Sequence, residues 1–174
     1  MEGKNICGNT KYKYSKGYIG LPVEISNLPK TIVIDSKTLS LKSTFHVSLV
    51  CVKNILLAHK DIPNLEKKIL DVFCKFVSKN EISFEKYKDE FRYAKDGERE
   101  TIVAMCAVSN IEKLFKILNK EFGLETETPP THVTLYTLQP DMGIGLNNMS
   151  DIENKTEVIA EKMPTEVREI LKRK

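Results

Sequence analysis

Two of the three histidines in this chain lie in nearly the same four-residue context. His46 begins the segment His-Val-Ser-Leu, with the hydroxyl of Ser48 two positions later. His132 begins His-Val-Thr-Leu, with Thr134 in the corresponding place. Neutral imidazole can take a proton from water or a ribose hydroxyl, imidazolium can give one to a leaving oxygen, and hydroxyls can hold phosphate oxygens. The repeat therefore favours acid–base chemistry on a phosphodiester, with one histidine as the base and the other as the acid.

Both motifs lie in segments that are predicted to be β-strands. Residues 45–52 and 131–138 are apolar, rich in β-branched side chains and too short for a typical helix. Because side chains alternate along a strand, each histidine would share one face with its hydroxyl, about 6.6 Å away along the backbone. The opposite face would be buried; it carries Val47, Leu49, Val133 and Leu135. If the two strands face one another, the four polar side chains line a single cleft.

The remaining sequence predicts further helices and strands. Strands are expected over residues 18–25, 31–36, 82–93, 101–108 and 155–161. Amphipathic helices are expected over residues 63–79, 111–122 and 164–174. A turn at residues 95–98 predicts a hairpin, and a glycine-bearing loop over residues 139–150 could fold over the cleft. The fold class expected from this pattern is α+β.

Composition limits the class of protein. The chain has 174 residues, of which 41% are hydrophobic and 29% charged, as in a globular protein and unlike a disordered one. We expect a single domain over residues 1–174, made of two packed lobes. The net charge of +3 does not demand a polyanionic partner. No apolar window approaches the roughly 18 residues of a membrane span, and the first residues show no secretory signal.

The four cysteines are scattered along the chain, at positions 7, 51, 74 and 106. They form no Cys-x-x-C pair and have no flanking histidine suited to a zinc site. We therefore expect free thiols packed as small apolar side chains, no metal site and a reducing compartment. The expected location is the cytoplasm.

The paired motif resembles the signature of the two-histidine (2H) phosphoesterase superfamily, two copies of His-x-(Ser/Thr)-x in which x is apolar. The resemblance covers most of the chain, since motif order, separation, strand setting and length all agree. It implies a bilobal α+β fold in which two antiparallel sheets flank a central cleft, with helices on the outside. It also implies that His46, Ser48, His132 and Thr134 form the catalytic quartet and that no cofactor is needed.

The substrate class is less sharply indicated. A small nucleotide, a cyclic oligonucleotide or an RNA terminus with a 2′,3′-cyclic phosphate or 2′-5′ linkage would suit this chemistry. The loop at residues 143–146 and the N-terminal lysines and tyrosines are similar to features of the phage-type cyclic-oligonucleotide phosphodiesterases of the superfamily. Tyr136, expected on the His132 face, and Tyr12 are candidates for stacking on a base, and Glu157 for contacting a base edge or orienting an imidazole.

The sequence also allows two functions other than phosphodiester hydrolysis. A non-catalytic nucleotide- or RNA-binding module would keep the cleft without turnover. An RNA end-joining enzyme would need two polynucleotide ends, for which a charge of +3 is modest. No obligatory protein partner is indicated by the sequence.

Overall fold

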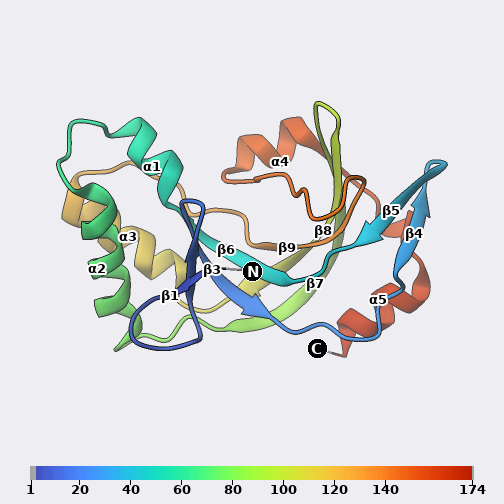
Figure 1. Cartoon of the computed structure of the whole chain (residues 1–174), viewed down its shortest axis with the longest axis horizontal. Helices are drawn as coiled ribbons and strands as arrows, with labels where there is room; N and C mark the ends of the chain where they lie inside the picture. Colours follow the sequence, from blue (N-terminus) through green and yellow to red (C-terminus); the bar gives the residue numbers. More distant parts are fainter. Residues whose placement is uncertain (1–2, 174) are drawn as a thin grey trace.

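The computed structural model describes residues 3–173, in which strands and helices are mixed and the strands pair antiparallel (Figure 1). The expected α+β class is confirmed. The strands are β1 (Lys4–Asn5), β2 (Lys13–Ser15), β3 (Tyr18–Val23), β4 (Thr31–Ile34), β5 (Lys37–Leu41), β6 (Phe45–Cys51), β7 (Phe84–Asp96), β8 (Arg99–Val108), β9 (His132–Thr137) and β10 (Thr156–Val158). The helices are α1 (Val52–Ala58), α2 (Leu65–Val77), α3 (Ile111–Phe122), α4 (Met149–Lys155) and α5 (Thr165–Lys172), with a 3-10 turn η1 (Ala160–Lys162). Within residues 3–173, no helix is both long enough and apolar enough to cross a membrane.

The ten strands form one hydrogen-bonded sheet. Its order is β1-β2-β3-β6-β9-β8-β7-β10, with β5 also paired to β9 and β4 paired to β5. The two motif strands, β6 and β9, are neighbours at the middle of this sheet, where Val47 lies opposite Val133. The expectation of two separate sheets is therefore not met, because the backbones of β6 and β9 join the two halves through this pair.

One face of the sheet carries the main hydrophobic core. The apolar residues expected on the buried face of the motif strands are fully buried there, as predicted: Val47, Leu49, Val133 and Leu135. The amphipathic helices α2, α3 and α5 contribute their apolar residues to the same core. Helices α1, α2 and α3 gather at one end of the molecule and α5 lies toward the other (Figure 1). The polar face of β6 and β9 is left uncovered by this packing.

The C-terminal third differs from the expected elements. Residues 155–161 were expected to form one strand, but α4 occupies residues up to Lys155 and the strand β10 is short. The helix begins because the side chain of Asn148 accepts a hydrogen bond from the backbone N–H of Asp151, which is a standard N-cap arrangement. The β7–β8 hairpin does form, with Gly97 in its turn at a φ of 61°.

The expectation of free thiols is wrong for two of the four cysteines. Cys7 and Cys74 form a disulfide, which ties the turn between β1 and β2 to helix α2. Their Cα atoms lie 4.9 Å apart although 67 positions separate them, a proximity that spacing cannot reveal. Cys51 and Cys106 are free. The disulfide removes the ground on which a reducing, cytoplasmic location was expected.

Candidate active site

The register of β6 and β9 brings the two motifs together. In an antiparallel pair centred on Val47 and Val133, His46 lies across from Thr134. On the other side of the same pair, Ser48 lies across from His132. All four polar side chains therefore point away from the main core, on one face of the two central strands. We call these residues, His46, Ser48, His132 and Thr134, the quartet.

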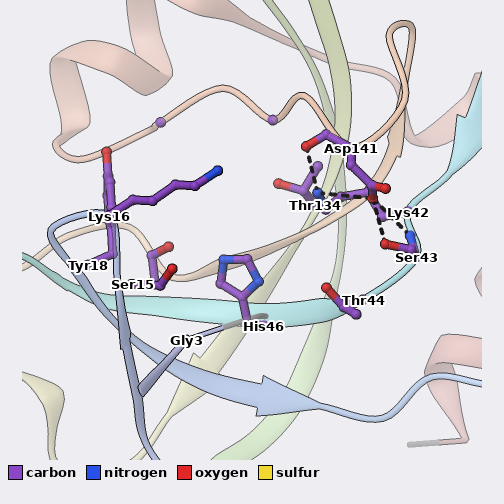
Figure 2. Close-up of a pocket in the computed structure, with 13 residues that line it drawn as sticks. Gly3, Ser15, Lys16, Tyr18, Lys42, Ser43, Thr44, His46, Thr134 and Asp141 are labelled. Atoms are coloured by element: carbon purple, nitrogen blue, oxygen red, sulfur yellow. Dashed lines mark hydrogen bonds and ion pairs between the residues drawn. The ribbon is translucent and has the colours of Figure 1, made fainter. Parts of the chain in front are cut away.

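A cavity of about 550 Å³ opens over this face; we call it the histidine cavity (Figure 2). Three members of the quartet line it, namely His46, Ser48 and Thr134. Its other walls come from the β1–β3 segment, the loop before β6 and the loop between β9 and α4: Gly3, Ser15, Lys16, Tyr18, Lys42, Ser43, Thr44, Asp141, Gly143 and Gly145. Segments far apart in the sequence thus converge on the quartet.

His132 lies beside this cavity and is more enclosed than His46. Its side chain is 8% exposed. Its Nδ1 lies 2.9 Å from the backbone oxygen of Pro130. Because a carbonyl oxygen only accepts hydrogen bonds, Nδ1 must carry the proton and Nε2 of the neutral ring keeps a free lone pair. Burial lowers the pKa of His132, while the Pro130 carbonyl acts to raise it. His132 is therefore held as a neutral ring whose Nε2 can accept a proton.

His46 projects into the cavity (Figure 2). Burial lowers its pKa to about 4, and the nearby charge of Lys42 acts in the same direction. Its Nδ1 is buried and has no hydrogen-bond partner among the described residues. A buried polar atom without a partner is costly unless a ligand or water satisfies it. The protein itself therefore leaves the hydrogen bonding of His46 incomplete.

The two hydroxyls of the quartet are also available. Ser48 and Thr134 are half-buried, and none of the hydrogen bonds found among residues 3–173 uses their side chains. Hydroxyls held on rigid strands in this way can donate to the oxygens of a bound phosphate without a prior rearrangement.

Positively charged side chains flank the quartet. Lys16, in the turn between β2 and β3, points into the cavity in Figure 2. Lys42 lies in the loop before β6, where its Nζ is 3.1 Å from the backbone oxygen of Asp141 and 3.7 Å from Oδ1 of that residue. The Asp141 carboxylate is the cavity's acidic group, and it also accepts hydrogen bonds from the backbone N–H and the hydroxyl of Ser43, at 3.0 and 2.9 Å. The two lysines outnumber the one carboxylate, which already accepts hydrogen bonds from Ser43. The lining therefore carries a net positive charge, and the cavity favours an anion.

Lys42, Ser43 and Asp141 were not among the expected site residues. The position of Lys42 and Ser43 immediately before the first motif strand is a signal that could have found them, because a loop at a strand end lies beside the strand's polar face. Asp141 offers no such signal, since its place depends on the path of the β9–α4 loop in space. That loop is not loose: Ile144 and Leu146 are buried in a second apolar cluster with Val103, Met105 and other residues.

The expectation that Tyr136 shares a face with His132 is wrong. On the β8 side, Thr134 lies opposite Val103 and Tyr136 opposite the next residue, Ile102, so β9 contains one extra residue at Leu135. This β-bulge reverses the alternation of side chains. Tyr136 is fully buried in the main core, and its hydroxyl donates to the backbone oxygen of Pro29 at 3.1 Å. No surface of its ring is left for stacking on a base.

Tyr12 and Glu157 also lie away from the quartet. Tyr12 is 2% exposed, packs edge-on against Phe73 and donates its hydroxyl proton to the backbone oxygen of Ile82. It is a core residue rather than a stacking platform. Glu157 lies on β10, paired with Tyr93 of β7 and exposed, and it does not line the histidine cavity. The structure thus brings together the four expected catalytic residues and none of the three expected substrate-binding residues.

Comparison with models of protein families, with curated proteins and with solved structures finds no match to this chain. Among the residues that the structure describes, no three His, Cys, Asp or Glu side chains gather as a metal ion would require.

Proposed function

We propose that this protein is a phosphodiesterase that hydrolyses a nucleotide phosphodiester with two histidines, without a metal ion or cofactor. One observation carries the proposal: the antiparallel pairing at Val47 and Val133 presents both His-x-(Ser/Thr) motifs on one face beside a cationic cavity. This arrangement supplies a base, an acid and hydroxyl donors for one phosphate group. The proposal treats the two halves of the sheet, each with one motif strand, as the two lobes of a 2H phosphoesterase-like fold.

The geometry suggests different roles for the two histidines. Nε2 of His132 has a free lone pair, so this residue is assigned as the base that takes a proton from the attacking water. The oxygen of that water then bonds to phosphorus as the bond to the leaving oxygen breaks. His46, in its protonated form, gives its proton to the leaving oxygen. The negative charge of a bound phosphodiester raises the pKa of His46 and so favours this form.

The remaining groups would stabilise the transition state. Ser48 and Thr134 can donate hydrogen bonds to the non-bridging oxygens, on which negative charge accumulates. Lys16 and Lys42 would provide the positive potential that attracts the substrate and offsets that charge. In this mechanism Lys42 interacts with the phosphate from its existing position beside Asp141.

The test is a hydrolysis assay in EDTA with purified wild-type protein and the variants His46→Ala and His132→Ala. The substrates are a 2′,3′-cyclic nucleotide, a 2′-5′ oligoadenylate, and 3′-5′ cyclic di- and trinucleotides, with products separated by chromatography. We expect turnover of one linkage class by the wild type and a loss of at least a hundredfold in each variant. Lys113→Ala, at an exposed position of α3 that does not line the histidine cavity, is the control and should retain activity.

Full activity in both quartet variants would contradict the proposal. Tight binding of one substrate without any product would instead favour the non-catalytic binding module. Joining of two RNA ends, rather than release of a monoester, would identify the end-joining alternative.

A further inference from the structure

A second cavity, of about 370 Å³, lies next to the histidine cavity. Its volume is in the range of small-molecule sites. It is lined by residues from α1, α3, the segment before β9 and the start of α4, among them Asn54, Phe115, Glu125, Glu127 and Pro129. No residue of the quartet lines it, and the proposed chemistry does not use it.

The two cavities share a wall at Tyr18. Tyr18 lines the histidine cavity, while its side chain interacts with those of Cys51 and Asn147, which line the second cavity. This wall is tightly packed, since a Cβ atom at Gly145 would lie 3.2 Å from the Tyr18 hydroxyl and 3.1 Å from Nδ2 of Asn147. The second cavity is thus built into the site rather than being a separate surface depression.

The quartet lies where the two cavities approach each other. Along β6, Ser48 lines the histidine cavity and Cys51, at the end of the strand, lines the second one. Along the other motif strand, Thr134 lines the histidine cavity and Pro129, just before the strand, lines the second. His132 lies between these two residues in the chain. A phosphate at the quartet would therefore have one cavity on each side.

The charges of the two cavities are opposite. Lys16 and Lys42 line the histidine cavity, whereas no lysine or arginine is found among the residues that line the second cavity. Two exposed acidic residues, Glu125 and Glu127, line the second cavity instead, and no hydrogen bond or ion pair found among residues 3–173 engages their carboxylates. Phosphate groups are favoured on the first side and repelled on the second, so a nucleotide is expected to bind in one direction only.

We propose that the second cavity is a nucleobase subsite, selective for an amino-bearing purine and for guanine above all. The exposed Ala58 and the half-buried Pro129 offer apolar surface for a flat ring, and the same cavity wall includes the buried Ile55 and Phe115. A carboxylate binds best to a group that donates two parallel hydrogen bonds, and the edge of guanine presents two adjacent N–H donors. Adenine presents a single amino group. Uracil presents one N–H between two carbonyl oxygens, which the carboxylate repels. Glu125 and Glu127 therefore favour guanine and disfavour uracil.

This inference rests on the proposed function, which places a phosphate at the quartet. The base would occupy the second cavity, and the first phosphate would lie at the quartet. A further phosphate would lie near Lys16 and Lys42. A nucleoside diphosphate has this linear order of groups and contains no phosphodiester for the enzyme to hydrolyse. It can therefore test the subsite by binding alone, apart from the hydrolysis assay.

The experiment measures the binding of GDP, ADP, UDP and inorganic pyrophosphate to the full chain by calorimetry. The wild type should bind GDP roughly tenfold more tightly than UDP, with ADP between them. The variant Glu125→Gln/Glu127→Gln should lose most of this preference and bind pyrophosphate as the wild type does. Lys16→Ala should weaken all four ligands together and leave the ratio of GDP to UDP affinity unchanged.

The matched control is Glu112→Gln/Glu121→Gln, which removes two exposed carboxylates from α3 outside the cavity and should keep the GDP preference. Equal affinity for GDP and UDP in the wild type, a preference that survives in Glu125→Gln/Glu127→Gln, or binding of none of the four ligands would overturn the inference. A GDP preference in a protein that hydrolyses no phosphodiester would overturn the proposed function and leave the subsite standing.

Discussion

His46 and His132 belong to matching motifs but have different surroundings. The ring of His132 is oriented by the Pro130 carbonyl, which determines the nitrogen that carries its proton. His46 has no such partner at its buried Nδ1. Two imidazoles of nearly equal intrinsic basicity thus become distinguishable through their hydrogen bonds, and this difference allows separate roles as base and acid to be assigned.

The lowered histidine pKa values predict an acidic activity profile. The two limbs of kcat/KM against pH report the acid and the base of the free enzyme, and burial places both pKa values below the usual 6.5 or so. We expect kcat/KM to be greatest below pH 6.5 and kcat to be greatest at a higher pH, because bound substrate raises the pKa of the acid. Initial rates from pH 4 to pH 9 check this. A kcat/KM maximum above pH 7.5 would contradict the assignment.

The same burial predicts a loss of stability in acid. The pKa of His46 is about 4 in the folded protein and about 6.5 in the unfolded chain, so between these values the unfolded chain binds more protons. The contribution of neutral His46 to the free energy of unfolding is therefore fully present above pH 6.5, and it is lost as the pH decreases toward 4. His46→Gln does not titrate, so from pH 7.5 to pH 4.5 it should lose about 2 to 3 kcal/mol less than the wild type.

Urea unfolding at the two pH values measures this difference. The comparison is internal, since each protein is referred to its own stability at pH 7.5, where the imidazole is neutral in both states. Identical losses in the two proteins would show that His46 is not buried in the folded state as described.

At the level of elements, the β9–α4 loop completes the histidine cavity because it is held at both ends. At one end, the Asp141 carboxylate accepts two hydrogen bonds from Ser43, and these hold the pKa of Asp141 below its ordinary value. At the other end, the Asp151 carboxylate accepts the backbone N–H of Asn147 at 2.8 Å. Between these attachments, Ile144 is buried. The loop is a fixed wall of the site.

Removing the first attachment should therefore weaken substrate binding more than it weakens the fold. In Asp141→Ala the backbone N–H and hydroxyl of Ser43 lose their acceptor, and Lys42 loses its carboxylate partner. We expect KM to rise roughly tenfold with the free energy of unfolding changed by no more than about 1 kcal/mol. Steady-state kinetics and urea unfolding measure the two effects.

Asp35→Ala is the matched control for this change. Asp35 is an exposed carboxylate paired with Lys162 at 2.8 Å, in the β4–β5 turn and outside the histidine cavity. It should leave KM unchanged. Equal effects of the two substitutions on KM would show that the attachment at Asp141 does not shape the site.

At the level of the whole molecule, the disulfide links the site to the main core. Gly3, Ser15 and Lys16 of the β1–β3 segment line the histidine cavity, and Cys7 within that segment is bonded to Cys74 of α2. β1 is an edge strand of two residues, and it pairs only with β2 among the described strands. The disulfide therefore restrains a part of the cavity wall that backbone hydrogen bonds hold weakly.

Removal of this disulfide should lower the free energy of unfolding by about 2 to 4 kcal/mol, the typical range for a disulfide. Cys7→Ser/Cys74→Ser and wild type in dithiothreitol should both show the loss in urea unfolding. The double variant should not respond further to dithiothreitol, which is the control. If the wild type gains no thiols in dithiothreitol and keeps its stability, the disulfide has resisted reduction. A double variant as stable as the wild type would contradict the prediction.

The sequence by itself was sufficient for the features that depend on local pattern. Alternation along residues 45–52 and 131–138 identified the two central strands and, as far as Leu49 and Leu135, the side chains that enter the core, because period-two burial is a property of any half-buried strand. The helices α2, α3 and α5 followed from apolar residues at helical spacing. The quartet could be named for the same reason, as its members lie within the two strands.

Only the tertiary structure decided how these pieces meet. The pairing of β6 with β9, the bulge that turns Tyr136 into the core and the bond between Cys7 and Cys74 all join residues distant in the chain. The placing of Asp141 beside Lys42 and Ser43 is of the same kind. Strand register and loop path depend on the packing of the whole chain, and a local pattern contains no information about which distant segment lies beside it.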